Sequence, residues 1–482
     1  MWLCGVAAFF AYAYFYEAGG WNQNTRFDLV RALVEHHGIR IDDYQENTGD
    51  KADFEGHFYA DKAPGASFTA APVVAIARAG MRLTGGDPDS VANLLELTYL
   101  ASLAAAAIPG AIAVMLVWVI ARRVGASAAG ANVVALTFGI GTPFWAWATV
   151  FYGHTLAAAC LLGAFLLALR LGDADRTSAS RARLGLGIGA LVGWSVVTEF
   201  PTAIPGTVVV AFALSRAWSH GRGTLIRVAT TVAVAGGAFA LGLGAYHYSA
   251  FRNPFHVGYA SEQMAVLKNG FFGFTFPKAG TAAELLWGSY RGLLPLAPAL
   301  ALVPIGWWSW ARQTRGCATC RVGLVAAATF LVGFAMNASY EHWEGGWSFG
   351  PRHLGPVLGF AALALVPLWM KGGRAARAIV VTLALGGSGA ALVGISTTAQ
   401  PPAPTYDAPM RELLWPSFRA GHLSLNHQSY FQKYPGADIT DVDAPHAAWN
   451  LGEKMGLHGL PSLLPLVGGL VIVIGAAFRR TD

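Results

Sequence analysis

The sequence predicts an all-α protein whose core is a bundle of about twelve membrane-spanning helices. Hydrophobic residues make up 54% of the 482-residue chain and charged residues only 12%, whereas soluble domains carry about 25% charged residues. Apolar runs of about 20 residues, the length that crosses a bilayer, recur along the chain. They are rich in Ala, Leu, Gly and Val and too long for barrel strands. Helices are therefore the structure that satisfies their backbone groups in lipid.

Twelve apolar segments have the expected length of membrane spans. The first is followed by no small-residue cleavage site, so we expect it to be retained as a span. In chain order the segments are 2–16, 97–121, 129–146, 154–170, 184–199, 202–215, 227–247, 292–311, 322–338, 353–370, 376–395 and 460–478.

The distribution of charge predicts the topology. If the N-terminus is cytoplasmic, every cytoplasmic connection is short and basic, and the outer connections carry nearly all the carboxylates, as in the positive-inside pattern. The net charge of +6 comes from such scattered basic residues, so it does not indicate nucleic-acid binding. The basic connections are Arg122–Arg123, Arg170–Arg183, Arg216–Arg227, Arg312–Arg321, Lys371–Arg377 and Arg479–Arg480.

This pattern requires the apolar run Ala66–Leu83 to lie on the outer leaflet or to dip into it. If that run crossed the membrane, Arg122 and Arg123 would lie outside. A chain with thirteen spans and a broken charge rule remains an open alternative.

We divide the chain into three parts. Residues 1–395 form the transmembrane domain, which includes a large outer loop at 17–96. Residues 396–457 form an extracytoplasmic segment that is rich in proline at its start. Residues 458–482 supply the last transmembrane helix and a cytoplasmic tail.

The first outer loop begins with a predicted helix, Asn24 to His37. Its apolar residues recur at helical spacing and share one face, and Asn24 or Thr25 is the expected N-cap. We expect an amphipathic helix that lies at the membrane surface.

A polar loop follows between Asn47 and Gly65. Its sequence Phe58-Tyr59-Ala60-Asp61-Lys62-Ala63-Pro64 resembles the aromatic-acid-Lys-Pro motif of GT-C superfamily membrane glycosyltransferases. These enzymes use polyprenyl-phosphate sugars and include protein mannosyltransferases and aminoarabinose transferases. Gly350-Pro351-Arg352 also resembles the family. The chain departs from the family pattern at Gln23-Asn24, where many relatives carry an acidic pair.

The resemblance implies a GT-C-like bundle with juxtamembrane helices in the first outer loop. It also implies a hexosyl- or pentosyltransferase that moves a sugar from a polyprenyl-phosphate carrier to an extracytoplasmic lipid, glycan or protein. Such a reaction needs a carboxylate for the acceptor proton and cations for the departing phosphate. The amides Gln23 and Asn24 cannot act as the base.

The base must therefore come from another position. Asp50 is the first candidate because it lies in a Gly-containing turn, and Asp28 is the second because it lies nearest to the family position. Asp61 is a further candidate. Asp42 and Asp43 also remain open. Lys62 and then Arg26 are the candidates for the carrier phosphate.

Other residues are expected to bind substrate. His154 and Glu199 are ionisable groups at span ends, which favours positions facing the bundle interior. Arg291 and Arg352 depart from the positive-inside tendency, and an anionic carrier headgroup would explain them. The alternatives are surface ion pairs, an aromatic belt and lipid snorkelling. The remaining candidates are Lys51, His57, Tyr59 and Tyr259.

A multi-span transporter or flippase of lipid-linked glycans is the alternative function, and a ligase or polymerase of such glycans shares most of the features. The ionisable residues cluster at outer span ends rather than near the midplane, which favours surface chemistry over transport.

The expected location is a bacterial cytoplasmic (inner) membrane, with the active site on the outer face and membrane lipids as neighbours. No metal site is predicted, although a divalent cation such as Mg²⁺ or Mn²⁺ stays open. Cys317 and Cys320 are interpreted as loop thiols, since structural zinc sites have four ligands.

Overall fold

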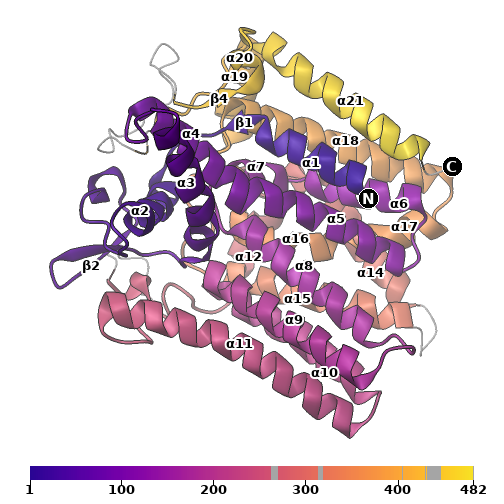
Figure 1. Cartoon of the computed structure of the whole chain (residues 1–482). Coiled ribbons are helices and arrows are strands. Elements are labelled where there is room, and N and C mark those ends of the chain that lie inside the picture. The colour runs from indigo at the N-terminus through magenta and orange to yellow at the C-terminus, as the bar shows by residue number, and fades with distance from the viewer. Residues whose placement is uncertain (262–269, 313–317, 404, 429, 431–446, 481–482) are drawn as a thin grey trace.

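The computed structural model describes the chain except for residues 262–269, 313–317, 404, 429, 431–446 and 481–482. Long helices run across the view in Figure 1, and both termini lie at one end of them. The helices of the bundle are α1 (Trp2–Ala13), α4 (Val91–Ser102), α5 (Ile108–Arg123), α6 (Ala128–Gly139), α7 (Phe144–Thr149), α8 (His154–Leu171), α9 (Ser178–Thr198), α10 (Ala203–Trp218), α11 (Arg222–Phe251), α13 (Leu293–Leu296), α14 (Val303–Ala311), α15 (Ala318–Ala338), α16 (Gly355–Ala362), α17 (Leu365–Lys371), α18 (Arg374–Thr397) and α21 (Leu464–Arg479).

Each of the twelve predicted spans falls on helical structure. In the described part of the chain, eight helical segments are long and apolar enough to cross a membrane, and α1 and α6 are shorter apolar helices. Segment 184–199 lies in α9, and segment 292–311 is broken into α13, a 3₁₀ turn and α14. Neither of these belongs to the eight, so the count of twelve spans stays a prediction. The polytopic helical class is confirmed.

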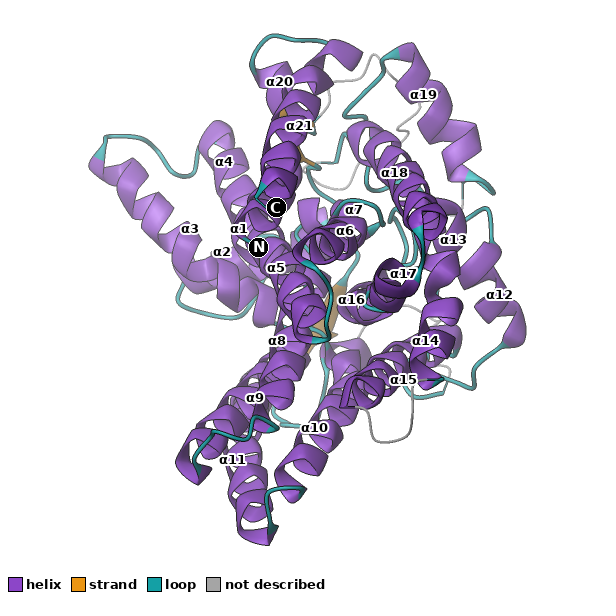
Figure 2. Ribbon diagram, turned by 90° about the vertical axis from the view of Figure 1, so that its right-hand side faces the viewer, coloured by secondary structure: helices purple, strands orange, loops and turns teal. Residues whose placement is uncertain are grey.

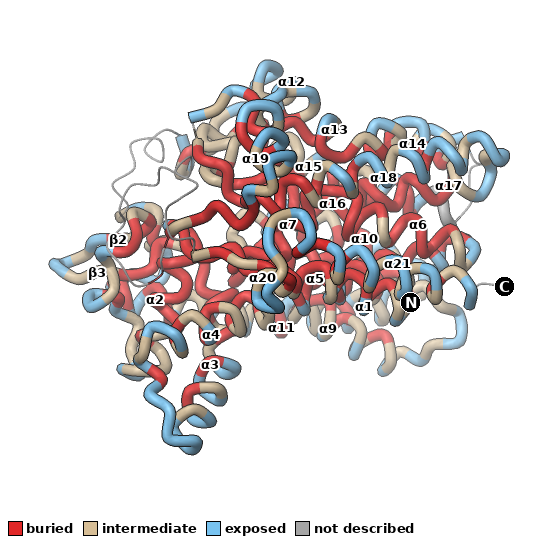
Figure 3. Tube along the Cα trace, turned by 90° about the horizontal axis from the view of Figure 1, so that it is seen from above, coloured by how far each residue is buried: buried red, intermediate tan, exposed pale blue. Residues whose placement is uncertain are grey.

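The core lies around α8, which is buried along almost its whole length. Helix α8 packs against α5, α9, α10 and α16, and the end-on view in Figure 2 shows these helices grouped around it. The buried positions form a continuous band through the middle of the bundle in Figure 3. By contrast, α11 and α21 expose Leu241, Val471 and Ile472. Lipid tails are as apolar as these side chains, so such exposure is expected on the outer faces of a membrane bundle.

The segment Val91–Arg123 is one long helix that contains a π-helical turn at Leu103–Ala107. The turn frees backbone groups from the regular ladder. The hydroxyl of Thr155 donates to the carbonyl of Ala106 at 3.0 Å. This bond ties the long helix to the start of α8, where His154 lies.

The first outer loop contains α2 (Trp21–Glu35), the strands β2 (Lys51–Phe54) and β3 (His57–Ala60), and α3 (Gly65–Leu83). In Figure 1 these elements lie at the end of the bundle opposite the termini. The strands form an antiparallel hairpin that the sequence analysis did not predict. Its two-residue turn, Glu55-Gly56, has positive φ at both positions, as type I′ hairpin turns require. Helix α3 is not among the eight candidate spans, which agrees with a helix on the outer leaflet.

The predicted start of the first outer helix is wrong. Helix α2 begins at Trp21, after the extended residue Gly20, and Asn24 lies inside its first turns. The Asn24 side chain accepts a hydrogen bond from the backbone N–H of Gly20 at 3.1 Å. The helix is also more buried than an amphipathic surface helix, because Arg26 and Asp28 on its polar side are covered as fully as Phe27.

The described parts of segment 396–457 contact the junction between α1 and α2. Strand β1 (Phe15–Tyr16) pairs with β4 (Trp449–Asn450). The carboxylate of Glu17 accepts a hydrogen bond from the backbone N–H of Ala399 at 2.9 Å, and the Asn426 amide donates to the carbonyl of Glu17 at 2.6 Å. The remaining outer helices are α12 (Ala279–Trp287), α19 (Trp415–Ala420) and α20 (Leu451–Lys454).

The junction predicts a pH dependence of stability. Burial raises the pKa of Glu17 from 4.5 to about 8, since the one backbone donor does not compensate for the lost hydration. The folded protein therefore holds a proton that the unfolded chain releases. The stability supplied by the neutral carboxyl is present below pH 4.5 and is lost as the pH rises through 8.

We expect the Glu17→Gln variant to resist alkaline pH better than the wild type, because glutamine keeps the acceptor oxygen and cannot ionise. The measurement is thermal unfolding in detergent between about pH 5 and 9, followed by tryptophan fluorescence. The midpoint of the wild type should fall with rising pH and that of the variant should fall less. Parallel curves for the two proteins would contradict the assignment.

Candidate functional site

Two adjoining cavities lie at the end of the bundle opposite the termini, where α2, the β2–β3 hairpin and the loop before α16 meet. The larger has a volume of about 750 Å³ and the smaller about 50 Å³. Asn22, Asp50, His342 and Arg352 line both of them. The smaller cavity is completed by Arg26, Lys62, His154, Glu199, Tyr259, Tyr340 and His353.

The hairpin register brings the acid and base groups of the loop together. Lys51 pairs with Ala60 across the two strands. Asp50 precedes β2 and Asp61 follows β3, so their side chains leave the hairpin side by side. Lys62 Nζ forms an ion pair with Asp50 Oδ2 at 3.1 Å and a second one with Asp61. All three side chains are nearly buried, so each charge depends on the others for compensation.

Asp50 is held by the turn that precedes it. The hydroxyl of Thr48 accepts from the backbone N–H of Asp50 at 3.0 Å and donates to the carbonyl of Trp21 at 2.8 Å. Gly49 packs directly against the Trp21 ring, and a side chain there would overlap the ring. The turn therefore aims the Asp50 carboxylate at the mouth between the two cavities.

A second charge cluster is centred on Glu199, which follows α9. Its Oε1 lies 2.9 Å from Arg26 Nη2 and 3.5 Å from His154 Nδ1. Gly153 allows this approach, since a methyl group at that position would collide with the carboxylate. Glu199 is compensated in this buried position by the positive charge of Arg26. The cluster joins α2, α8 and α9 beside the Asp50–Lys62 pair.

The two outer arginines have different surroundings. Arg352 lies against the Tyr152 ring, with Cζ 4.7 Å from the ring centroid, and its buried Nε has no hydrogen-bond partner among the described residues. Arg291 donates to the carbonyls of Gly346 and Pro401 at 2.9 and 3.3 Å. The Nε of Arg291 is also buried without a hydrogen-bond partner in the described part of the chain, so the difference is that Arg352 lines both cavities whereas Arg291 joins two loops.

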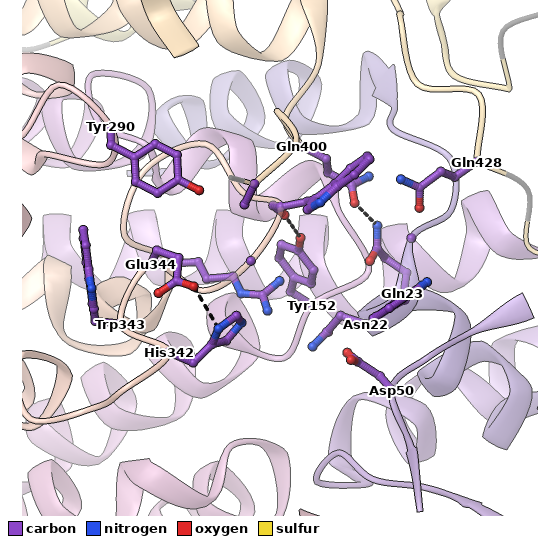
Figure 4. A pocket seen from close by; sticks show the side chains of 16 residues that line it. Asn22, Gln23, Asp50, Tyr152, Tyr290, His342, Trp343, Glu344, Gln400 and Gln428 are labelled. Carbon is purple, nitrogen blue, oxygen red and sulfur yellow. Dashed lines mark hydrogen bonds and ion pairs between the residues drawn. The ribbon is translucent and has the colours of Figure 1, made fainter. Parts of the chain in front are cut away.

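The wall of the larger cavity, drawn in Figure 4, consists mainly of amides and aromatic rings. Gln23 donates to Gln400, the Tyr152 hydroxyl donates to the carbonyl of Trp347 at 3.0 Å, and His342 Nδ1 lies 2.9 Å from a Glu344 oxygen. Beyond the four shared residues, the lining comprises Gly20, Trp21, Gln23, Tyr152, Tyr290, Trp343, Glu344, Gly346, Trp347, Gln400, Ala403 and Gln428.

Seven of the predicted site residues line the cavities. They are Asp50, Arg26, Lys62, His154, Glu199, Tyr259 and Arg352. Asp61 lies directly behind Lys62. Tyr259 lies over Lys62, with 5.0 Å between the ammonium nitrogen and the ring centroid.

Asp28 does not line either cavity. It is fully buried, and Asn47 donates to its Oδ1 at 2.9 Å. Burial raises the pKa of Asp28 well above its usual value, against the lowering by Asn47, Arg31 and Lys51. Asn47 also donates to the carbonyl of Tyr430 at 2.6 Å. Asp28 thus anchors the loop that carries Asp50.

Three further candidates lie outside the cavity walls. Lys51 Nζ donates to the carbonyl of Gln45 at 2.7 Å, and His57 pairs with Asp42 on the exposed side of the hairpin at 2.9 Å. Tyr59 packs against Phe251. None of the three lines either cavity.

The sequence analysis missed most of the larger wall. Its unassigned polar members are Asn22, Gln23, Tyr290, His342, Glu344, Gln400 and Gln428. The glycine-rich stretch from Trp343 to His353 was a usable signal, because its glycines allow the loop to approach the cavity closely. The sequence around Gln400 and Gln428 contains no motif that indicated a place in a cavity wall.

The described residues contain no group of three or more His, Cys, Asp or Glu side chains that could hold a metal ion. The carboxylates of Asp50 and Asp61 are paired with Lys62 instead. Cys4 and Cys160 are free and buried. Cys317 lies outside the described residues, as does the side chain of Cys320.

No protein-family model matches the chain, and no curated protein sequence matches it significantly. Solved structures do match. ArnT from Cupriavidus metallidurans bound to undecaprenyl phosphate superimposes with a TM-score of 0.55 and 16% identity, over 98% of this chain and 75% of that one. The apo state of ArnT superimposes with a TM-score of 0.51 and 14% sequence identity, over 99% of this chain and 72% of that one. The archaeal oligosaccharyltransferase AglB from Archaeoglobus fulgidus has a TM-score of 0.48 and 14% sequence identity, over 90% of this chain and 60% of that one.

The likeness to ArnT extends over nearly the whole chain, so it covers the bundle together with the outer elements that hold the cavities. It confirms the fold class that the motifs around Lys62 and Arg352 predicted. The chain has the GT-C fold of a polytopic membrane protein.

Proposed function

We propose that this protein is an integral membrane glycosyltransferase that moves a hexose or pentose from a polyprenyl-phosphate carrier to an extracytoplasmic acceptor. The observation that carries the proposal is the Asp50–Lys62 ion pair at the mouth of two adjoining cavities. The pair offers a base and a phosphate-binding cation within one site. The ArnT structure of the same fold holds undecaprenyl phosphate, which supports a lipid-linked donor.

Asp50 is proposed as the general base. An acceptor hydroxyl oxygen attacks the anomeric carbon of the donor sugar, and its proton passes to the Asp50 carboxylate. The bond between the anomeric carbon and the phosphate oxygen breaks, and its electron pair leaves with the polyprenyl phosphate. A positioned base of this kind contributes a factor of about 10²–10⁴ to the rate.

Lys62 and Arg352 are proposed to hold the phosphate. Both line the smaller cavity, and both side chains are cations of the kind that bind phosphate oxygens. Cations in a site with little water stabilise the charge that develops on the leaving group. Arg26 and His154 line the same cavity and both contact Glu199.

The proposed location is a bacterial cytoplasmic membrane, with the cavities on its outer face. The charge pattern supports this orientation, since the basic connections lie at the opposite end of the bundle. A transporter or flippase of lipid-linked glycans would use the same cavities for passage. Donor binding or movement without transfer would favour that alternative.

The first test compares two buried aspartates. We expect Asp50→Asn to lower sugar transfer by about 10²-fold or more, because asparagine cannot accept the proton. We expect Asp28→Asn to keep transfer within a few-fold, because asparagine has nearly the same shape and keeps an acceptor oxygen for the Asn47 amide. The assay supplies labelled polyprenyl-phosphate sugars and a membrane extract as acceptor to protein in detergent. Full activity in Asp50→Asn would exclude it as the base.

The second test compares two lysines of the same loop. Lys62→Gln should lower the turnover number by about 10²–10³-fold, because it removes a cation from the leaving phosphate. Lys51→Gln should stay near wild type, since Lys51 bonds to Gln45 outside the cavities. Binding of a fluorescent polyprenyl phosphate gives a second readout. Equal losses in the two variants would place the phosphate elsewhere.

The third test concerns the face of the membrane. The exposed hairpin turn should react with an impermeant thiol reagent added to intact cells when it carries Glu55→Cys. Asp175→Cys, in an exposed basic connection, should react only after the cells are opened. Both variants are made with Cys317 and Cys320 replaced by serine. Labelling of Glu55→Cys only in opened cells would invert the proposed topology.

A further inference from the structure

The two cavities differ in size by more than tenfold. A volume of about 50 Å³ lies far below the range of about 300–1000 Å³ of ligand pockets, so the smaller cavity suits a small group such as a phosphate and not a sugar ring. The larger one, at about 750 Å³, falls within the range of about 300–1000 Å³ that holds drug-sized ligands. A glycan acceptor that reaches Asp50 must therefore lie in the larger cavity.

The polar groups of the larger wall are mostly uncharged. Four carboxamides line it, and each one can donate and accept hydrogen bonds at the same time. Sugar hydroxyls also do both, so they match a carboxamide better than a group that only donates or only accepts. The four are Asn22, Gln23, Gln400 and Gln428.

Aromatic rings form the rest of the wall. Flat apolar faces suit the C–H faces of a sugar ring, while the N–H and O–H groups at the ring edges remain available to hydroxyls. Figure 4 shows Tyr290 and Trp343 on the side opposite the carboxamides Gln23 and Gln428. The aromatic members are Trp21, Tyr152, Tyr290, Trp343 and Trp347.

The charges are divided between the cavities. The smaller one is lined by three cations (Arg26, Lys62 and Arg352) and two carboxylates (Asp50 and Glu199), so basic charge is in excess when histidines are neutral. The larger one has Arg352 against two carboxylates, Asp50 and Glu344. Lysine is absent from its lining residues. An anionic ligand in the larger cavity would face like charges, which lowers affinity for such a partner.

From these observations we propose that the acceptor is the end of a neutral, hydroxyl-rich glycan, bound in the larger cavity with its reactive hydroxyl toward Asp50. This inference rests on the proposed transferase function and narrows it, since it excludes an acceptor that carries phosphate or carboxylate at the reacting end. The carrier phosphate occupies the smaller cavity, and the donor sugar and the acceptor end meet beside Asp50.

The test separates candidate acceptors by their charge. A cell-envelope extract is separated by anion exchange into a neutral glycan fraction and an acidic fraction that carries phosphate or uronate groups. Each fraction is supplied to the full-length protein with a panel of labelled polyprenyl-phosphate sugars. We expect the label in the neutral fraction, and its loss in Asp50→Asn.

Two wall variants give a readout that donor chemistry alone would not change. Gln428→Met keeps the side-chain volume and removes the amide, and Trp343→Ala removes a ring. Each should raise the apparent KM for the neutral acceptor about tenfold, in line with a lost hydrogen bond or stacking contact, and leave the KM for the donor near wild type. The control is Trp415→Ala, a half-exposed tryptophan on α19 outside the cavity lining.

The outcomes separate the two proposals. Label in the acidic fraction would overturn the neutral acceptor and leave the transferase standing. An unchanged acceptor KM in both wall variants would also overturn it. Label in neither fraction, with any donor of the panel, would overturn the transferase function and this inference with it.

Discussion

The ion pairs of Lys62 with Asp50 and Asp61 are the interaction on which the outer half of the molecule depends. A buried ammonium group is costly unless paired, and so are two buried carboxylates. The hairpin exists in the register that satisfies all three, with Asp50 and Asp61 leaving the strands side by side. The Arg26–Glu199 pair extends the same compensation from α2 to α9. Charge pairing, rather than apolar packing, therefore sets the geometry of the cavity mouth.

Much of the fold could be predicted because a bilayer imposes length and composition on each span. The apolar segments were located correctly as helical structure. The motif residues Asp61 and Lys62 and the distant Arg352 lie together at the end of the bundle that holds the cavities. The hairpin escaped prediction because its strands are short and carry charged residues such as Lys51 and Asp53. The start of α2 was misplaced because Asn24 resembles an N-cap in sequence, while in the fold it bonds to Gly20 from inside the helix.

The site was predictable only where chemistry is local. Asp50 and Lys62 lie twelve positions apart and belong to one loop, so their pairing was within reach of the sequence. Gln400 and Gln428 are held at the same cavity by contacts with Glu17, Gly19 and Gln23. The residues next to them in the sequence form no motif that would have predicted this position. Asp28 is the opposite case, because its closeness to a family position made it a candidate base, whereas in the fold it is buried against Asn47 and lines neither cavity.

The attachment of residues 396–457 to the β1–α2 junction has a consequence for biogenesis. A nascent chain that has reached residue 395 already carries Asp50, Lys62 and Arg352, but it lacks Gln400, Gln428 and the strand that pairs with β1. Its larger cavity would be open to water on that side. Sugar bound there would meet water as readily as an acceptor, and hydrolysis would compete with transfer. Closure of the wall by the last-made part of the outer surface thus delays a sheltered reaction centre until the whole chain is in place.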